Sequence, residues 1–257
     1  AIVITLRTPF DKSAGRIRTL RNRWRLDTVV LDAGHGGKDG GTIGTSGTRE
    51  KDIVLDITKR LGMLLEKKTN IKVVYTREED VFIPLWKRTK KANESNGKIF
   101  VSIHANGNPN RTARGFDVFL LNESKSDEAI ELASRENAVI KLEEHSGDQY
   151  KELTGENLIM ATMAQSMFVM ESEVLADLIQ EELGNRLDSP NRGVKQAGFQ
   201  VLVGASMPNV LIETGFLTNP TDEKRLKQSS YRQKIAEGIF SAIVKFRSIR
   251  EALLAEG

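Results

Sequence analysis

The sequence has 257 residues, of which 39% are hydrophobic and 28% charged, and its formal net charge is +3 at pH 7. This composition can form a buried core, and so small a net charge argues against nucleic acid as the main partner. Cysteine is absent, so disulfides and thiolate metal sites are excluded, and any metal must bind to His, Asp, Glu or water.

Residues 1–26 differ from the rest of the chain because they hold seven basic residues and a single acidic one. We expect a solvated basic linker with one short strand at 1–6, although these basic residues could instead contact an anionic polymer or a membrane surface. The chain begins with Ala1 and shows no signal peptide, which indicates a processed protein or an excised domain. No run of about 18 apolar residues occurs, so no transmembrane helix is predicted.

From residue 27 onward, apolar runs typical of strands alternate with segments of helical period. In chain order the pattern predicts strand 28–33, helix 51–66, strand 71–76, helix 84–93, strands 99–103 and 116–121, helices 127–142, 156–168 and 171–187, strands 199–203 and 209–212, and a final helix from 231. This order predicts one α/β domain over 27–257. Its sheet should be mostly parallel or mixed, with about six strands, and helices should flank both faces.

The segment 122–170 has a different composition, with ten acidic residues and four basic ones. Its two helical stretches are joined by a polar loop around Ser146 and Gly147. We therefore expect an inserted helical segment that the α/β domain carries.

Three of the predicted strands end in a residue that can bind a metal. His35 follows the first strand, His104 follows IFVSI and Glu213 follows NVLI, while Glu50 stands after a loop with seven glycines at 34–47. Two histidines and a carboxylate form a suitable ligand set for catalytic zinc, and a further carboxylate can move the proton. Position alone does not decide whether Glu50 or Glu213 is the ligand.

Other interpretations of these residues have weaker support. A single histidine at a strand end is more often a packed residue than a ligand, and we interpret His145, in a polar acidic loop, as solvated. No G-x-S-x-G or H-E-x-x-H pattern is present, which argues against a serine nucleophile and a helical zinc motif. The glycine-rich stretch lacks the spacing of a phosphate-binding loop.

Five ordered motifs show a specific resemblance. LDAGHGGKDGGTIGTSGTREKD, YTREEDVFIPLWKR, VSIHANG, RGVKQAGFQVL and VLIETGFLTNP resemble the zinc-dependent N-acetylmuramoyl-L-alanine amidases of bacterial cell-wall turnover. The match runs from about Asp27 to Phe246 and leaves out residues 1–26. One local departure, Asp39-Gly40-Gly41, stands where relatives often have D-P-G.

The resemblance implies a role for each residue of the site. The zinc ligands would be His35, Glu50 and His104, and Glu213 would be the catalytic glutamate. The implied reaction is hydrolysis of the amide between the lactyl group of N-acetylmuramic acid and L-alanine of the peptidoglycan stem peptide. Substrate-positioning candidates are Arg77, Asn106 and Arg192. The alternatives are another zinc amide hydrolase, such as a peptidase or deacetylase, and a non-catalytic wall-binding module.

The acidic insertion resembles the segment carried by the cell-division branch of this family. Members of that branch are periplasmic, act in daughter-cell separation and need an activator protein, because an inserted helix occludes the zinc cleft. The helix 127–142 would have this role here, with Glu136 as the plug in preference to Glu131, Glu143 or Glu144. Adaptable methionine-rich surface on the helix 156–168 suits a partner groove, although core packing is the commoner use.

Overall fold

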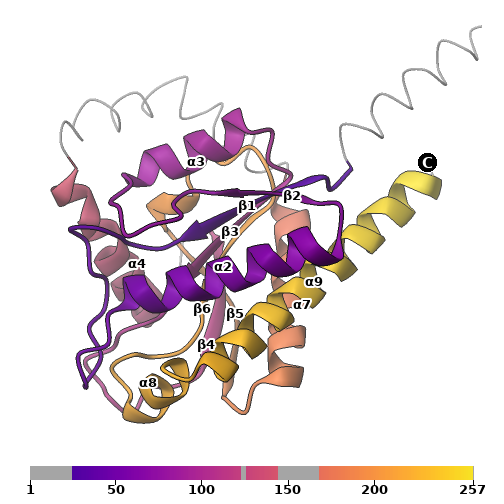
Figure 1. Ribbon diagram of the computed structural model, residues 1–257. Helices are drawn as coiled ribbons and strands as arrows, with labels where there is room; N and C mark the ends of the chain where they lie inside the picture. The colour runs from indigo at the N-terminus through magenta and orange to yellow at the C-terminus, as the bar shows by residue number, and fades with distance from the viewer. Residues whose placement is uncertain (1–24, 123–125, 144–167, 257) are drawn as a thin grey trace, which may run out of the picture.

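A computed structural model of the protein describes residues 25–122, 126–143 and 168–256. The six strands are β1 (Thr28–Ala33), β2 (Lys72–Tyr75), β3 (Ile99–His104), β4 (Phe116–Leu121), β5 (Asn191–Ala197) and β6 (Asn209–Glu213). They form one sheet in the order β2-β1-β3-β6-β4-β5 (Figure 1). Only the β4–β6 pair is antiparallel. The predicted α/β domain with a mixed sheet of about six strands is confirmed.

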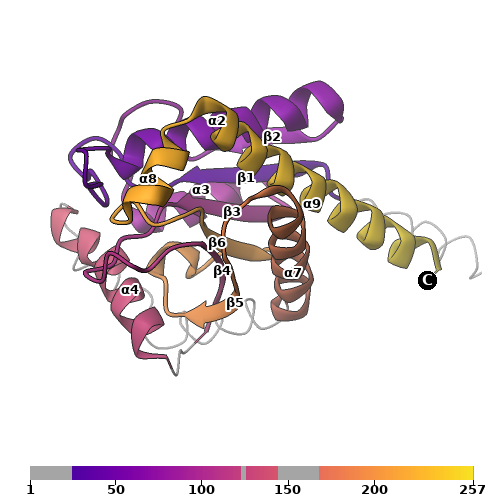
Figure 2. The same ribbon diagram turned by 90° about the horizontal axis from the view of Figure 1, so that it is seen from below.

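Helices cover both faces of the sheet (Figures 1 and 2). One face packs against α2 (Glu50–Lys68), α7 (Val169–Arg186) and α9 (Ser229–Glu256). The other face is covered by α3 (Leu85–Glu94), α4 (Asp127–Asn137) and the 3-10 turn η2 (Gln200–Leu202). Side chains of β1 alternate between the two cores, as the period of two in a strand requires. No helix in this described part of the chain combines the length and apolarity needed to cross a membrane.

Some predicted elements were wrong or incomplete. The predicted strand 199–203 contains η2 instead, and the strand at the sheet edge is the polar β5, which has no apolar run to reveal it. The predicted helix 127–142 divides into α4 and the 3-10 helix η1 (Ala138–Leu142). Sequence reasoning also missed α8 (Pro220–Leu226), which Asn219 caps at its N-terminus. The predicted strand 1–6 and helix 156–168 lie outside the described residues.

The topology brings the three predicted strand ends to one edge. β1, β3 and β6 are parallel neighbours, and His104 of β3 pairs in register with Glu213 of β6. His35 lies two residues beyond the end of β1. The carboxyl edge of the sheet is therefore where the candidate site is built.

Candidate metal centre and active site

Two arginine side chains donate hydrogen bonds to the backbone of the loop that carries His35. His35 has φ 59°, a left-handed conformation that is uncommon for a residue with a side chain. Arg88 donates to the carbonyl oxygens of Ala33 (2.8 Å) and His35 (2.9 Å), and Arg77 donates to that of Gly34 (2.7 Å). These hydrogen bonds hold the imidazole at the sheet edge and offset the cost of the strained backbone.

Two glycines are needed because the ligand side chains pass very close to the backbone. A Cβ atom on Gly34 would lie 2.4 Å from the His104 ring. A Cβ atom on Gly41, which has φ 65°, would lie 2.6 Å from Oε2 of Glu50. The loop turns back through Thr42, whose N–H donates to Glu50 Oε2 at 2.7 Å. The glycine-rich stretch therefore makes room for the donors.

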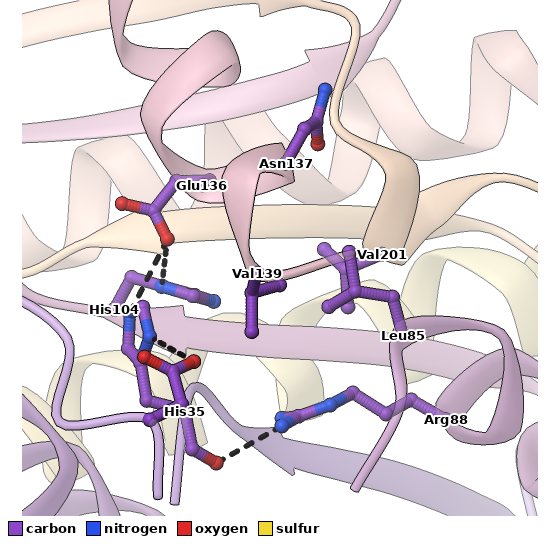
Figure 3. A pocket seen from close by; sticks show the side chains of 9 residues that line it. His35, Leu85, Arg88, His104, Glu136, Asn137, Val139 and Val201 are labelled. Carbon is purple, nitrogen blue, oxygen red and sulfur yellow. Dashed lines mark hydrogen bonds and ion pairs between the residues drawn. The ribbon is translucent and has the colours of Figure 1, made fainter. Parts of the chain in front are cut away.

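Two histidines and two glutamates converge at this edge, and Figure 3 shows three of them, His35, His104 and Glu136. The Nε2 atom of His35 lies 3.0 Å from Glu50 Oε1 and 3.2 Å from Glu136 Oε2. The Nδ1 atom of His104 lies 3.2 Å and 3.3 Å from the same two oxygens. Glu136 reaches the site from α4, while the other three residues belong to the body of the domain.

The chemistry and spacing of these donors fit a zinc ion. Imidazole nitrogens and carboxylate oxygens bind Zn²⁺ at about 2.0–2.2 Å, so tetrahedral ligands lie roughly 3.3–3.5 Å apart. The contacts of 3.0–3.3 Å between the imidazoles and the two carboxylates are close to that spacing. In addition, His35 Nδ1 is 2.8 Å from Asp39 Oδ2. A carboxylate behind a histidine orients it as metal-binding histidines are commonly oriented.

The electrostatics of the site favour bound positive charge. Burial alone would lower the pKa of His104, but the carboxylates of Glu136 and Glu50 raise it to about 10. Burial would raise the pKa of Glu136, yet His35 and His104 lower it to about 2. The two carboxylates thus stay ionised in a buried place, which is the condition for binding a cation.

Glu213 lies beside these donors and has a different environment. The side chain is fully buried, and neither of its oxygens has a hydrogen-bond partner among the described residues. Burial, followed by the negative charges of Glu136 and Glu50, raises the pKa of this carboxyl well above its ordinary value. A carboxylate without fixed partners at a metal site can exchange protons with a substrate.

The three positioning candidates occupy different places. Arg77 is only 2% exposed and donates to backbone carbonyls under the loop, so it supports the loop and does not face the site surface. Asn106 is buried directly after the β3 edge. Arg192 is partly exposed on β5 and binds Asp117.

Helix α4 is held over the site by several contacts besides Glu136. Its residues Ala129, Leu132 and Ala133 are buried in the core that it shares with η2. The Asn137 amide donates to the carbonyl of Gly198 at 2.9 Å, and its oxygen accepts from the N–H of Gln200 at 2.9 Å. Helix α4 is therefore docked on the rest of the described structure.

Sequence reasoning missed two supporting residues, Arg88 and Asp39. Arg88 is 1% exposed and forms a buried ion pair with Asp32 at 2.9 Å. The Asp32 carboxylate also accepts hydrogen bonds from the hydroxyl groups of Thr76 and Ser102. The available signal was a charged residue on the inner face of an amphipathic helix. For Asp39 the signal was a carboxylate four residues after the histidine.

A buried set of imidazoles and carboxylates at the carboxyl edge of an α/β sheet is a donor set that could hold a catalytic metal ion in a hydrolase. The sequence profile of the N-acetylmuramoyl-L-alanine amidase family matches residues 29–245. This chain belongs to that family.

Similar proteins include the amidase AmiC of Escherichia coli, which is 38% identical over 239 residues. The match covers 91% of this chain but 54% of that relative, so the chain spans about half its length. Among solved structures, the amidase AmiC2 of Nostoc punctiforme has 31% identity and a TM-score of 0.62, covering 85% of this chain and 96% of that one. The CwlD amidase of Clostridioides difficile, solved with the GerS lipoprotein, has 29% identity and a TM-score of 0.63, with coverage of 87% and 99%.

Proposed function

We propose that the protein hydrolyses the amide between the lactyl group of N-acetylmuramic acid and L-alanine of the peptidoglycan stem peptide, in a zinc-dependent reaction. The observation that carries the proposal is the convergence of His35, Glu50 and His104 beside Glu213, in a chain of the amidase family.

Each of these residues has a stated role in the proposal. His35, Glu50 and His104 hold zinc, which when bound supplies a Lewis acid and a water of lowered pKa. Glu213 accepts a proton from the attacking water and returns it to the nitrogen of L-alanine as that amine leaves. Its carboxylate is suited to this because no other described residue holds its oxygens by hydrogen bonds.

We further propose that α4 keeps the protein inactive until a partner displaces it. The support is the position of Glu136 Oε2, 3.2 Å from His35 Nε2 and 3.3 Å from His104 Nδ1, where it takes a fourth donor position. Catalytic zinc needs an open position for water or substrate, so a fourth protein ligand blocks turnover. An activator protein that binds the insertion would remove this ligand.

The same proposal includes a setting for the activity. By analogy with the cell-division branch of the family, which the acidic insertion resembles, we place the protein in the periplasm, in cell-wall remodelling and daughter-cell separation. The domain boundaries proposed are a basic linker at 1–26, a catalytic domain at 27–257 and a regulatory insertion at 122–170. The CwlD amidase solved with a lipoprotein is a precedent in this family for assembly with a partner.

The experiment is digestion of purified sacculi by the Glu136→Ala protein, from which the proposed inhibitory carboxylate is removed, followed by mass spectrometry of the released fragments. The proposal predicts free stem peptides that begin with L-alanine, and glycan strands that stay intact. Fragments that keep L-alanine on muramic acid would indicate a peptidase, released acetate a deacetylase, and binding without release a non-catalytic module. Any of these three results would contradict the proposal.

A further inference from the structure

Two cations on β5, Arg192 and Lys195, are shared between a carboxylate of the domain and one of α4. Towards the domain, Arg192 Nε lies 3.0 Å from Asp117 Oδ2 and Lys195 Nζ lies 2.7 Å from Asp117 Oδ1. Towards α4, Arg192 Nη2 lies 2.5 Å from Glu128 Oε1, and Lys195 Nζ lies 3.6 Å from Glu128 Oε2. Helix α4 therefore places one carboxylate, Glu136, beside the two histidines and another, Glu128, beside this cation pair.

The domain holds the Arg192 guanidinium without help from α4. Asp117 is 1% exposed and fixes the Nε edge of the guanidinium. The guanidinium carbon lies 5.1 Å from the ring centre of Phe216, a fully buried residue on which it stacks. These contacts leave the Nη2 edge directed at the position that Glu128 fills, so an anion site remains when α4 is displaced.

This cation pair is next to the proposed catalytic carboxylate. Asp117 of β4 pairs directly with Glu213 of β6 across the antiparallel ladder, and Phe216 follows three residues after Glu213. A stem peptide cleaved at L-alanine has its first free carboxylate on the second residue, where that residue is D-glutamate and not D-isoglutamine. A carboxylate just beyond the scissile amide has the charge opposite to that of the cation pair, and it would lie near the catalytic carboxylate, as the pair does.

We infer that Arg192 and Lys195 form a subsite for a carboxylate of the stem peptide, and that Glu128 fills this subsite while α4 is docked. The inference rests on the proposed function, because it names what the same site accepts. With Glu128 present, two cations face two carboxylates. Without Glu128, one positive charge is left for the substrate.

The test compares two soluble muropeptides that differ only at the second residue, D-glutamate in one and D-isoglutamine in the other. A charge-assisted, oriented contact predicts a kcat/KM about tenfold or more higher for the acid. In Arg192→Gln this ratio falls to near one, and Arg192→Lys keeps part of it. The ratio is independent of α4 docking, because both substrates meet the same fraction of open protein.

The control is Lys245→Gln, which also removes one positive charge. Lys245 lies on α9 and pairs with Glu181 and Glu182 of α7. It should leave the ratio unchanged. Equal kcat/KM for the two substrates in the wild type, or a preference that persists in a folded Arg192→Gln, would overturn the subsite. If neither muropeptide is cleaved, even by the Glu136→Ala protein, the proposed function fails. Calorimetric binding of the two stem peptides to Glu128→Gln then decides the subsite, and equal affinities would overturn it.

Discussion

Replacing Glu136 with alanine should increase the fraction of protein in which α4 no longer blocks the site. The size of the increase follows from the contacts that are lost. One carboxylate oxygen, Oε2, contacts both His35 Nε2 and His104 Nδ1. Because a single oxygen makes both contacts, we count one charge-assisted interaction, worth about 1.5–3 kcal/mol. Each 1.4 kcal/mol changes an equilibrium by about tenfold, so the open fraction should rise about ten- to a hundredfold.

The assay is the initial rate of peptide release from purified sacculi by Glu136→Ala and by the wild type, without activator. The matched control is Glu131→Ala on the same helix, because Glu131 is 58% exposed and pairs only with Arg135 among the contacts that the structure describes. An exposed pair is worth about 0–1 kcal/mol, so the control should change the rate by a few-fold at most. A Glu136→Ala protein that folds, binds zinc and shows the wild-type basal rate would refute the plug.

Three further substitutions test separate parts of the molecule. Glu213→Gln should keep zinc binding and lower kcat by about 10²–10⁴-fold in the sacculus assay; wild-type turnover would exclude the proton-transfer role. Arg88→Gln leaves the buried Asp32 carboxylate without the arginine that balances its charge, so urea unfolding should show a loss of about 3–5 kcal/mol, and zinc affinity should fall with it. A loss of stability with unchanged zinc affinity would argue against support of His35. Glu223 accepts hydrogen bonds from Thr45 and Ser46, which lower its pKa to about 2 although burial would raise it. Its folded pKa is below the unfolded value of about 4.3, so its stabilisation is present above pH 4.3 and is lost as the pH falls towards 2. Glu223→Gln should cost about 1–3 kcal/mol at pH 7 and much less at pH 2, as urea unfolding at the two pH values would show.

The edge of the sheet could be predicted from the sequence because local signals and topology agree there. Apolar runs that end in His35, His104 and Glu213 are visible in the sequence, and parallel neighbours must present those ends together. The position of Glu50 relative to the histidines could not be derived in this way. It depends on a loop that turns back so that Thr42 meets Glu50, and no periodic pattern encodes such a turn.

Contacts between distant segments account for the other differences between prediction and structure. Arg88 binds carbonyl groups more than fifty residues earlier in the chain, and nothing local to α3 predicts those partners. β5 pairs with β4 although its sequence, NRGVKQA, is polar, because an edge strand is only half buried. The apolar residues Phe199, Val201 and Leu202 suggested a strand, yet they are buried as a turn that packs against α3 and α4.

Metal dependence is most directly tested by removing and restoring zinc in the Glu136→Ala protein. Metal is stripped with a chelator, and zinc is added back in steps while bound zinc and peptide release from sacculi are measured together. A site formed by His35, Glu50 and His104 predicts no release from the stripped protein, and a rate that rises with bound zinc up to one ion per chain. The same titration of His104→Ala in this background should show neither binding nor release. Full activity in the stripped protein, or zinc binding that survives His104→Ala unchanged, would contradict the assignment of these residues.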